Sequence, residues 1–98
     1  MAETSNTSGY PMKYIVFAAS GGREAPVLFP HAFTHSWVAG ELRPMTPVSA
    51  GFVEMSEAGD IRCFGHSSSL RLPSRPKIDT ELVRAHLAGD GQVGSVAR

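Results

Sequence analysis

Residues 47–66 read PVSAGFVEM, then SEAGD, then IRCFGH. Two apolar runs rich in β-branched and aromatic residues flank five residues typical of turns, and this pattern predicts a β-hairpin. Gly59 can adopt a positive φ at the turn, and Asp60 can close the loop with its own side chain. We expect Phe52 and Phe64 to be core residues that oppose one another across the hairpin, and the other elements to pack on it.

Two strands are predicted before the hairpin. Residues 12–18 are apolar at both parities after Lys13, which indicates a central strand covered on at least one face and shielded on the other. Residues 27–29 form a short run between Pro26 and Pro30. Because proline has no backbone N–H, this second strand is expected at an edge of the sheet.

Two helices are predicted, one on each side of the hairpin in sequence. Thr34 is a good N-cap for a helix that ends near Leu42. Its expected core side chains are Trp37, Val38 and Leu42, with Phe33 packing from the position before the cap.

The second helix is expected to be capped by Ser74 or Asp79 and to end near Ala88, with Gly89 after its last turn. Its predicted apolar stripe consists of Ile78, Leu82, Ala85 and Leu87.

The order of these elements is β-β-α-β-β-α. It predicts an α+β fold: an antiparallel β-meander of about four strands with two short helices, both on one face. We expect a disordered N-terminal extension at 1–11, a single domain at 12–88 and a flexible tail at 89–98, which is rich in glycine.

The composition is that of a globular protein whose net charge produces no strong electrostatic field. The chain has 98 residues, of which 42% are hydrophobic and 18% charged, and nine basic side chains balance nine acidic ones. A net charge of zero provides no long-range attraction to nucleic acid or to an anionic membrane, and it offers no repulsion against self-association.

The sequence predicts a cytoplasmic protein that does not enter a membrane. Its longest apolar run, residues 14–19, is far shorter than the ~20 residues of a membrane helix. The first residues lack the basic and apolar regions of a signal peptide. Cys63 is the only cysteine, so no intramolecular disulfide can form.

Three core segments carry a resemblance. Residues 14–17 (YIVF), 26–30 (PVLFP) and 48–52 (VSAGF), in this order, resemble segments of short uncharacterised proteins of bacteria and prophages. The resemblance extends over residues 12–88 and implies no activity.

Four side chains are candidate metal ligands: His31, His35, Cys63 and His66. The spacings His-x3-His and Cys-x2-His resemble halves of zinc motifs. If Thr34 caps the helix, however, His31 lies outside it, and Cys63 and His66 point to opposite faces of a strand unless Gly65 forms a bulge. We therefore expect no bound metal and no cofactor.

An enzyme using Cys63 with one of the histidines is an alternative. Such a nucleophile requires a setting that stabilises its thiolate, and Arg62 points away from Cys63 if both lie on a strand. No third, orienting group stands at an informative position. We expect Cys63 to be a buried core residue and predict no catalytic residues.

A second alternative is a small nucleic-acid-binding protein. No acidic side chain interrupts the cations between Ile61 and Ile78, which are Arg62, Arg71, Arg75 and Lys77. With the serines at 67–69 they are candidates for a phosphate-binding surface. Four cations in this length of chain also fit a solvated loop, so we consider nucleic acid the less favoured partner.

The sequence thus predicts a small structural module that acts by protein–protein contact with an unidentified partner. Its simplest form is a homodimer that associates through a sheet edge or the apolar side of the hairpin.

Overall fold

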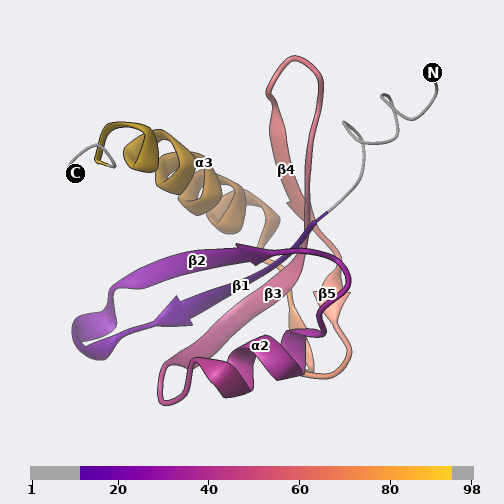
Figure 1. Ribbon diagram of the computed structural model, residues 1–98, viewed down its shortest axis with the longest axis vertical. Helices are drawn as coiled ribbons and strands as arrows, with labels where there is room; N and C mark the ends of the chain where they lie inside the picture. The colour runs from indigo at the N-terminus through magenta and orange to yellow at the C-terminus, as the bar shows by residue number, and fades with distance from the viewer. Residues whose placement is uncertain (1–11, 94–98) are drawn as a thin grey trace.

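The computed structural model describes residues 12–93 (Figure 1). Their order is β1 (Met12–Ala18), a 3-10 turn η1 (Ser20–Gly22), β2 (Glu24–Phe29), α2 (His35–Glu41), β3 (Thr46–Met55), β4 (Ile61–Phe64), β5 (His66–Ser67), β6 (Leu72–Pro73) and α3 (Pro76–Val93). The predicted α+β class is confirmed, with a four-stranded sheet and two helices.

The strand order of the main sheet is β2-β1-β3-β4, and every pairing is antiparallel. β1 is central and β2 is an edge strand, as predicted, but β2 begins at Glu24 and so contains Pro26, which was expected to precede the strand. The order differs from the order along the chain because β3 pairs with β1 and not with β2. β5 and β6 form a separate two-stranded ribbon between the hairpin and α3.

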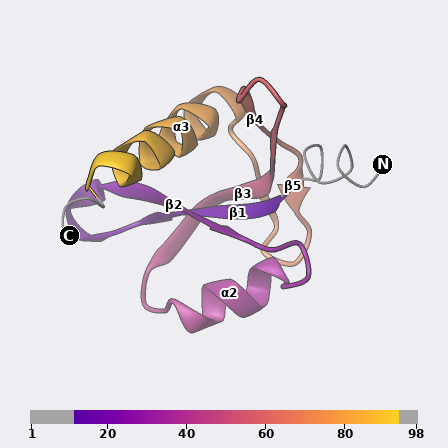
Figure 2. The same ribbon diagram turned by 45° about the horizontal axis from the view of Figure 1, so that its top comes forward.

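The two helices cover opposite faces of the sheet, which corrects the expectation that they share one face (Figure 2). Ile15 and Phe17 of β1 pack in a cluster with Val38 and Ala39 of α2. Tyr14 and Val16, which alternate with them, pack in a second cluster that contains Val83 of α3. The continuous apolar run of β1 therefore belongs to a strand buried on both faces.

The predicted hairpin is formed by β3 and β4. At its turn the Ser56 N–H donates to the Asp60 carbonyl at 2.9 Å, and Gly59 has a φ of 93°. The side chain that closes the loop is Ser56, whose Oγ accepts from the Asp60 N–H at 3.1 Å; the expected role of the Asp60 side chain is not observed. Phe52 and Phe64 pair across the strands as predicted, but both are only half-buried.

The first helix, α2, begins where the sequence predicts, but a different face of the helix is buried in the core. The Thr34 Oγ1 accepts from the Trp37 N–H at 3.1 Å, which confirms the N-cap. Trp37 is wrongly predicted as a core residue: its side chain is 54% exposed and stacks on Phe33, with ring centroids 5.2 Å apart. The buried residues of α2 are His35, Val38 and Ala39.

The second helix extends to Val93, past the end predicted near Ala88. Its predicted apolar stripe is also wrong in part, because Ile78, Ala85 and Leu87 are exposed. The buried side chains are Asp79 and Val83. The first core position of α3 is held by the carboxylate of Asp79. A prediction that accepts only apolar residues as core therefore selects the neighbouring face of the helix.

Residues 1–11 and 94–98, in which the N-terminal extension and most of the predicted tail fall, lie outside the described residues. Between Met12 and Val93 no helix has the length and apolar character required to cross a membrane.

Candidate functional site

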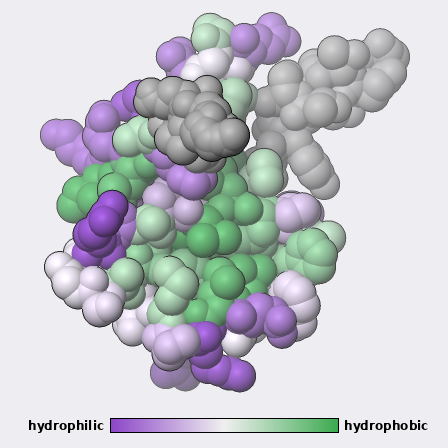
Figure 3. Space-filling model, turned by 60° about the vertical axis from the view of Figure 1, so that its left-hand side comes forward, coloured by the Kyte–Doolittle hydropathy of each residue, from purple (hydrophilic) through white to green (hydrophobic). Residues whose placement is uncertain are grey.

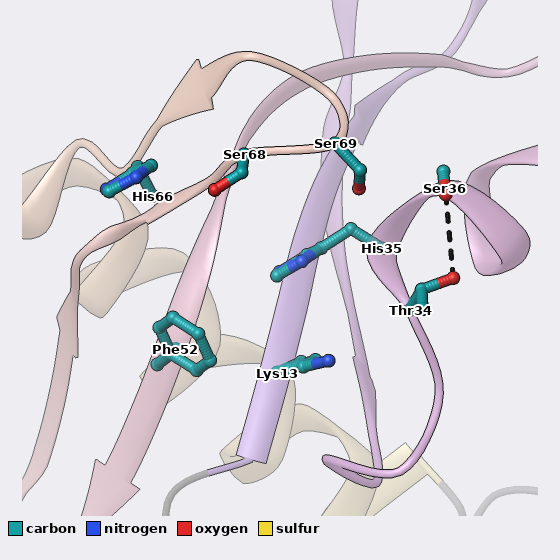
Figure 4. Close-up of a pocket in the computed structure, with 8 residues that line it drawn as sticks. All are labelled: Lys13, Thr34, His35, Ser36, Phe52, His66, Ser68 and Ser69. Carbon is teal, nitrogen blue, oxygen red and sulfur yellow. Dashed lines mark hydrogen bonds between the residues drawn. The ribbon is translucent and has the colours of Figure 1, made fainter.

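A surface pocket of about 380 Å³ opens beside the start of α2 (Figure 4). Four parts of the chain line it, and they are far apart in sequence: β1, the first turn of α2, β3, and the segment containing β5 and the following serines. Its lining residues are Lys13, Thr34, His35, Ser36, Phe52, His66, Ser68 and Ser69.

His35 is the buried side chain of this pocket. It is 5% exposed, and its ring lies edge-on to Phe29 and to Phe52, with centroids 5.6 and 5.9 Å away. Its Nε2 lies 2.9 Å from the carbonyl oxygen of Gly51. Because a carbonyl can only accept, Nε2 carries the proton.

The environment of His35 favours the neutral imidazole. Burial lowers the pKa of His35; the hydrogen bond to the Gly51 carbonyl opposes this in part, and the charge of Lys13 adds a smaller lowering. With the proton on Nε2, the neutral ring presents Nδ1 as a hydrogen-bond acceptor.

The other polar groups of the pocket include one ammonium, which only donates, and four hydroxyls, each of which can donate or accept. The Lys13 Nζ donates to the Phe33 carbonyl at 2.8 Å, and an ammonium has further N–H groups to offer. Thr34 and Ser36 lie on one side, and Ser68 and Ser69 lie above the imidazole (Figure 4). The lining that the described residues provide contains one lysine, two histidines and four hydroxyls, with no aspartate or glutamate. This arrangement is suited to binding a polar or anionic group against the ring of Phe52.

A second polar cluster, which we call the Asp79 network, is buried between α3 and the sheet. The Asp79 carboxylate is 0% exposed and accepts from the Tyr14 hydroxyl at 2.5 Å and from the Ser49 hydroxyl at 2.9 Å. It also accepts from the backbone N–H and the Nε of Arg75, at 2.9 and 3.0 Å. Arg75 reaches Glu24 of β2 at 2.9 Å.

The Asp79 network is satisfied and closed, which indicates a structural role. Burial and the contact with Asp79 raise the pKa of Tyr14, so its hydroxyl stays protonated and donates. Among the described residues, no buried side-chain nitrogen or oxygen lacks a hydrogen-bond partner. The sequence predicts Asp79 only as a possible N-cap, whereas it lies inside α3, which begins at Pro76. The pattern that points to its burial is the i, i+3, i+4 spacing of Asp79, Leu82 and Val83 on one helix face.

The candidate zinc ligands are divided between different parts of the fold. His35 and His66 line the same pocket, whereas Cys63 belongs to the core cluster that contains Val83 on the opposite, α3 side of the sheet. His31 is exposed in the turn that precedes α2. Among the side chains that the structure describes, no three from histidine, cysteine, aspartate or glutamate gather in a way that could hold a metal ion.

Cys63 is a buried core residue, as predicted. Its side chain is 1% exposed, and burial raises the pKa of the Cys63 thiol. The protonated thiol is therefore favoured, which is the opposite of what a nucleophilic cysteine requires. The backbone N–H of Cys63 donates to the Thr80 hydroxyl of α3 at 3.0 Å.

The four candidate phosphate-binding cations do not form one surface. Arg75 is committed to Glu24 and Asp79 inside the Asp79 network. Arg62 pairs with Glu54 at 2.6 Å and lies over the ring of Phe64, 4.6 Å from its centroid.

Of the remaining cations, Lys77 shares a second shallow pocket with Arg62, between β4 and the start of α3. Arg71 is exposed, in the connection between β5 and β6. The acidic Glu81 lines the same pocket as Lys77, which weakens its attraction for a phosphate.

The chain matches no protein-family model, no curated protein and no solved structure. The resemblance to short bacterial and prophage proteins therefore stays a prediction.

Proposed function

We propose that this protein is an interaction module that acts by protein–protein contact, and that it does so as a homodimer whose interface includes Phe33 and Trp37. The observation that carries the proposal is the exposed aromatic stack at the start of α2. Phe33 is 43% and Trp37 54% exposed, with the two rings inclined by only 20°. Aromatic side chains, tryptophan above all, are enriched at the centres of protein interfaces.

The properties of the whole chain favour a second copy as the occupant of this surface. The net charge is zero, so two copies do not repel one another. A domain of this size covers only part of its apolar surface. Figure 3 shows hydrophobic residues gathered in the middle of one face, with hydrophilic residues around them, so apolar surface is left open to solvent. A two-fold arrangement would bring Phe33 and Trp37 of both partners into one contact.

The edges of the sheet are less suited to this contact than the sequence suggested. At the β4 edge, the N–H of Cys63 is already bonded to Thr80. At the β2 edge, Pro26 lies within the strand and has no N–H to donate. Both features oppose strand-to-strand pairing, which leaves the aromatic stack as the favoured contact.

Light scattering coupled to size-exclusion chromatography tests the proposal on the full chain. We expect the mass of two chains at tens of micromolar, and the mass of one chain for Trp37→Ala. Ile78→Ala is the matched control, because Ile78 is also exposed, at 52%, but lies on α3. A single-chain mass for the unmodified protein, unchanged on concentration, would refute the dimer.

The fluorescence of Trp37 gives an independent reading, because it is the only tryptophan of the chain. Its emission should shift to longer wavelength on dilution, as the indole passes from the interface into water.

The reduced, buried thiol of Cys63 is compatible with the cytoplasm, which we propose as the location.

A further inference from the structure

We propose that the pocket beside α2 binds a small organic oxyanion, a carboxylate or a phosphate monoester attached to an apolar group. The inference rests on observations other than those that carry the dimer proposed above, although Thr34 and Ser36 of the pocket adjoin Phe33 and Trp37. It rests on the charge of the lining, on the buried imidazole at its base and on the aromatic ring beside them.

The charge of the lining selects for an anion. Lys13 is the permanent cation of the pocket, and none of the eight lining residues is acidic. One N–H of the Lys13 ammonium is held by the Phe33 carbonyl, which fixes the side chain in place. The remaining N–H groups are available for a charge-assisted hydrogen bond to a ligand oxygen.

The hydroxyls and the imidazole supply further polar contacts. Thr34, Ser36, Ser68 and Ser69 come from two segments that face one another across the pocket (Figure 4). The Thr34 and Ser36 hydroxyls lie 3.5 Å apart, so both can reach a single ligand group. The bond from Nε2 to Gly51 holds the His35 ring in place and leaves Nδ1 to accept from a ligand hydroxyl or water.

Phe52 defines the apolar part of the ligand. Its half-buried ring lines the pocket beside His35 and Lys13 (Figure 4). A volume of about 380 Å³ falls within the range of small-molecule sites. An aromatic or aliphatic group can cover Phe52 while its oxyanion meets Lys13 and the hydroxyls.

Nuclear magnetic resonance titration of the 15N-labelled full chain tests the site with benzoate and phenyl phosphate as probes. Benzylamine is the control, since it has a similar ring and the opposite charge. We expect saturable shifts of the amides of Thr34, Ser36, Ser68 and Ser69 with both anions, with a dissociation constant on the order of 1 mM. Tighter binding of phenyl phosphate would assign a phosphate as the natural group, and tighter binding of benzoate a carboxylate.

Two variants identify the site. Lys13→Gln should weaken anion binding about tenfold, because it removes a charge-assisted hydrogen bond. Lys77→Gln, which makes the same change on α3, should leave it unchanged.

Ser36→Asp should also weaken binding by repulsion, while an acidic residue in the first turn favours α2 and preserves the fold. Its control is Ser20→Asp in the exposed η1 turn. The proposal is overturned if no saturable shift occurs, if benzylamine binds as well as the anions, or if folded Lys13→Gln and Ser36→Asp both bind like the unmodified protein.

Discussion

Asp79 is the residue on which the position of α3 depends most. Its buried carboxylate accepts hydrogen bonds from β1, from β3 and from the residue that precedes the helix. A buried charge is tolerated only when it is paired and hydrogen-bonded, and removing one partner leaves the others unsatisfied. The Asp79 network therefore fixes how α3 sits on the sheet.

Asp79→Ala should lower the free energy of unfolding by about 3–5 kcal/mol, because Tyr14, Ser49 and Arg75 lose their common acceptor. The control Glu81→Ala removes an exposed carboxylate of the same helix, which pairs only with exposed Arg84. It should change stability by no more than about 0.5 kcal/mol. Urea denaturation followed by circular dichroism compares the two; equal effects would contradict a structural role for the network.

His35 should make the fold sensitive to acid. Burial lowers the pKa of His35 in the folded state below its ordinary value of about 6.5. Below about pH 6.5 the unfolded chain binds a proton at this histidine that the folded chain does not bind. The free energy of unfolding therefore decreases as the pH is lowered. The stabilisation that the neutral His35 gives to the fold is fully present above about pH 6.5, and it is lost as the pH falls through the lower pKa of the folded state.

Urea midpoints measured between pH 7.5 and pH 5 for His35→Phe and His66→Gln check this expectation. His35→Phe should show a weaker pH dependence than the unmodified protein, whereas His66→Gln, which changes an exposed histidine, should retain it. An unaltered pH dependence in folded His35→Phe would assign the acid sensitivity to other groups.

At the scale of elements, Gly51 allows β3, β4 and the segment before α3 to approach one another. A Cβ added at Gly51 would lie 2.4 Å from the carbonyl oxygen of Phe64 and 3.2 Å from the Cβ of Ser74. The closer of these atoms is backbone, which cannot move without disturbing the hairpin. The sequence VSAGF therefore requires glycine for close approach and not for an unusual φ.

Gly51→Ala should destabilise the protein by about 1–3 kcal/mol, the range found for overpacked sites. Gly40→Ala is a control that should stabilise the protein. Its Cβ would meet only the end of the Arg43 side chain, at 3.6 Å, and alanine favours a helix over glycine by about 1 kcal/mol. Thermal melts of both variants measure the difference, and a Gly51→Ala melt at or above that of the parent would contradict the packing.

At the scale of the whole molecule, the sheet is a central layer between two helices (Figure 2). The large hydrophobic residues exposed on these helices are Trp37 on α2 and Ile78 and Leu87 on α3. Trp37 and Ile78 are the most exposed large hydrophobic residues of the two helices. The aromatic stack differs from Ile78 in having a second ring packed against it.

If the protein is a homodimer in which dissociation accompanies unfolding, its midpoint of thermal unfolding should rise with protein concentration, because association stabilises the folded state by mass action. Scanning calorimetry over a hundredfold range of concentration measures the trend. Trp37→Ala should remove it and Ile78→Ala should preserve it. A midpoint independent of concentration in the unmodified protein would contradict the dimer.

The sequence by itself determined the elements whose signals are local. The SEAGD turn, the Thr34 cap and the edge position of the strand that contains Pro26 follow from residues within a few positions of one another. The burial of Cys63 and the central place of β1 follow from runs of apolar residues. These features depend on backbone conformation and on hydrophobicity along one segment.

Only the tertiary structure decided which segments meet. β3 pairs with β1, and the two helices pack on opposite faces of the sheet, with Cys63 on the α3 side and His35 on the α2 side. The partners of Asp79 and the lining of the pocket come from segments far apart in the chain. Trp37 is exposed because His35, Val38 and Ala39 occupy the buried side of a short helix. Hydrophobicity along the sequence does not show which face of a helix is buried, because a polar residue is stable in the core wherever the fold supplies its hydrogen bonds.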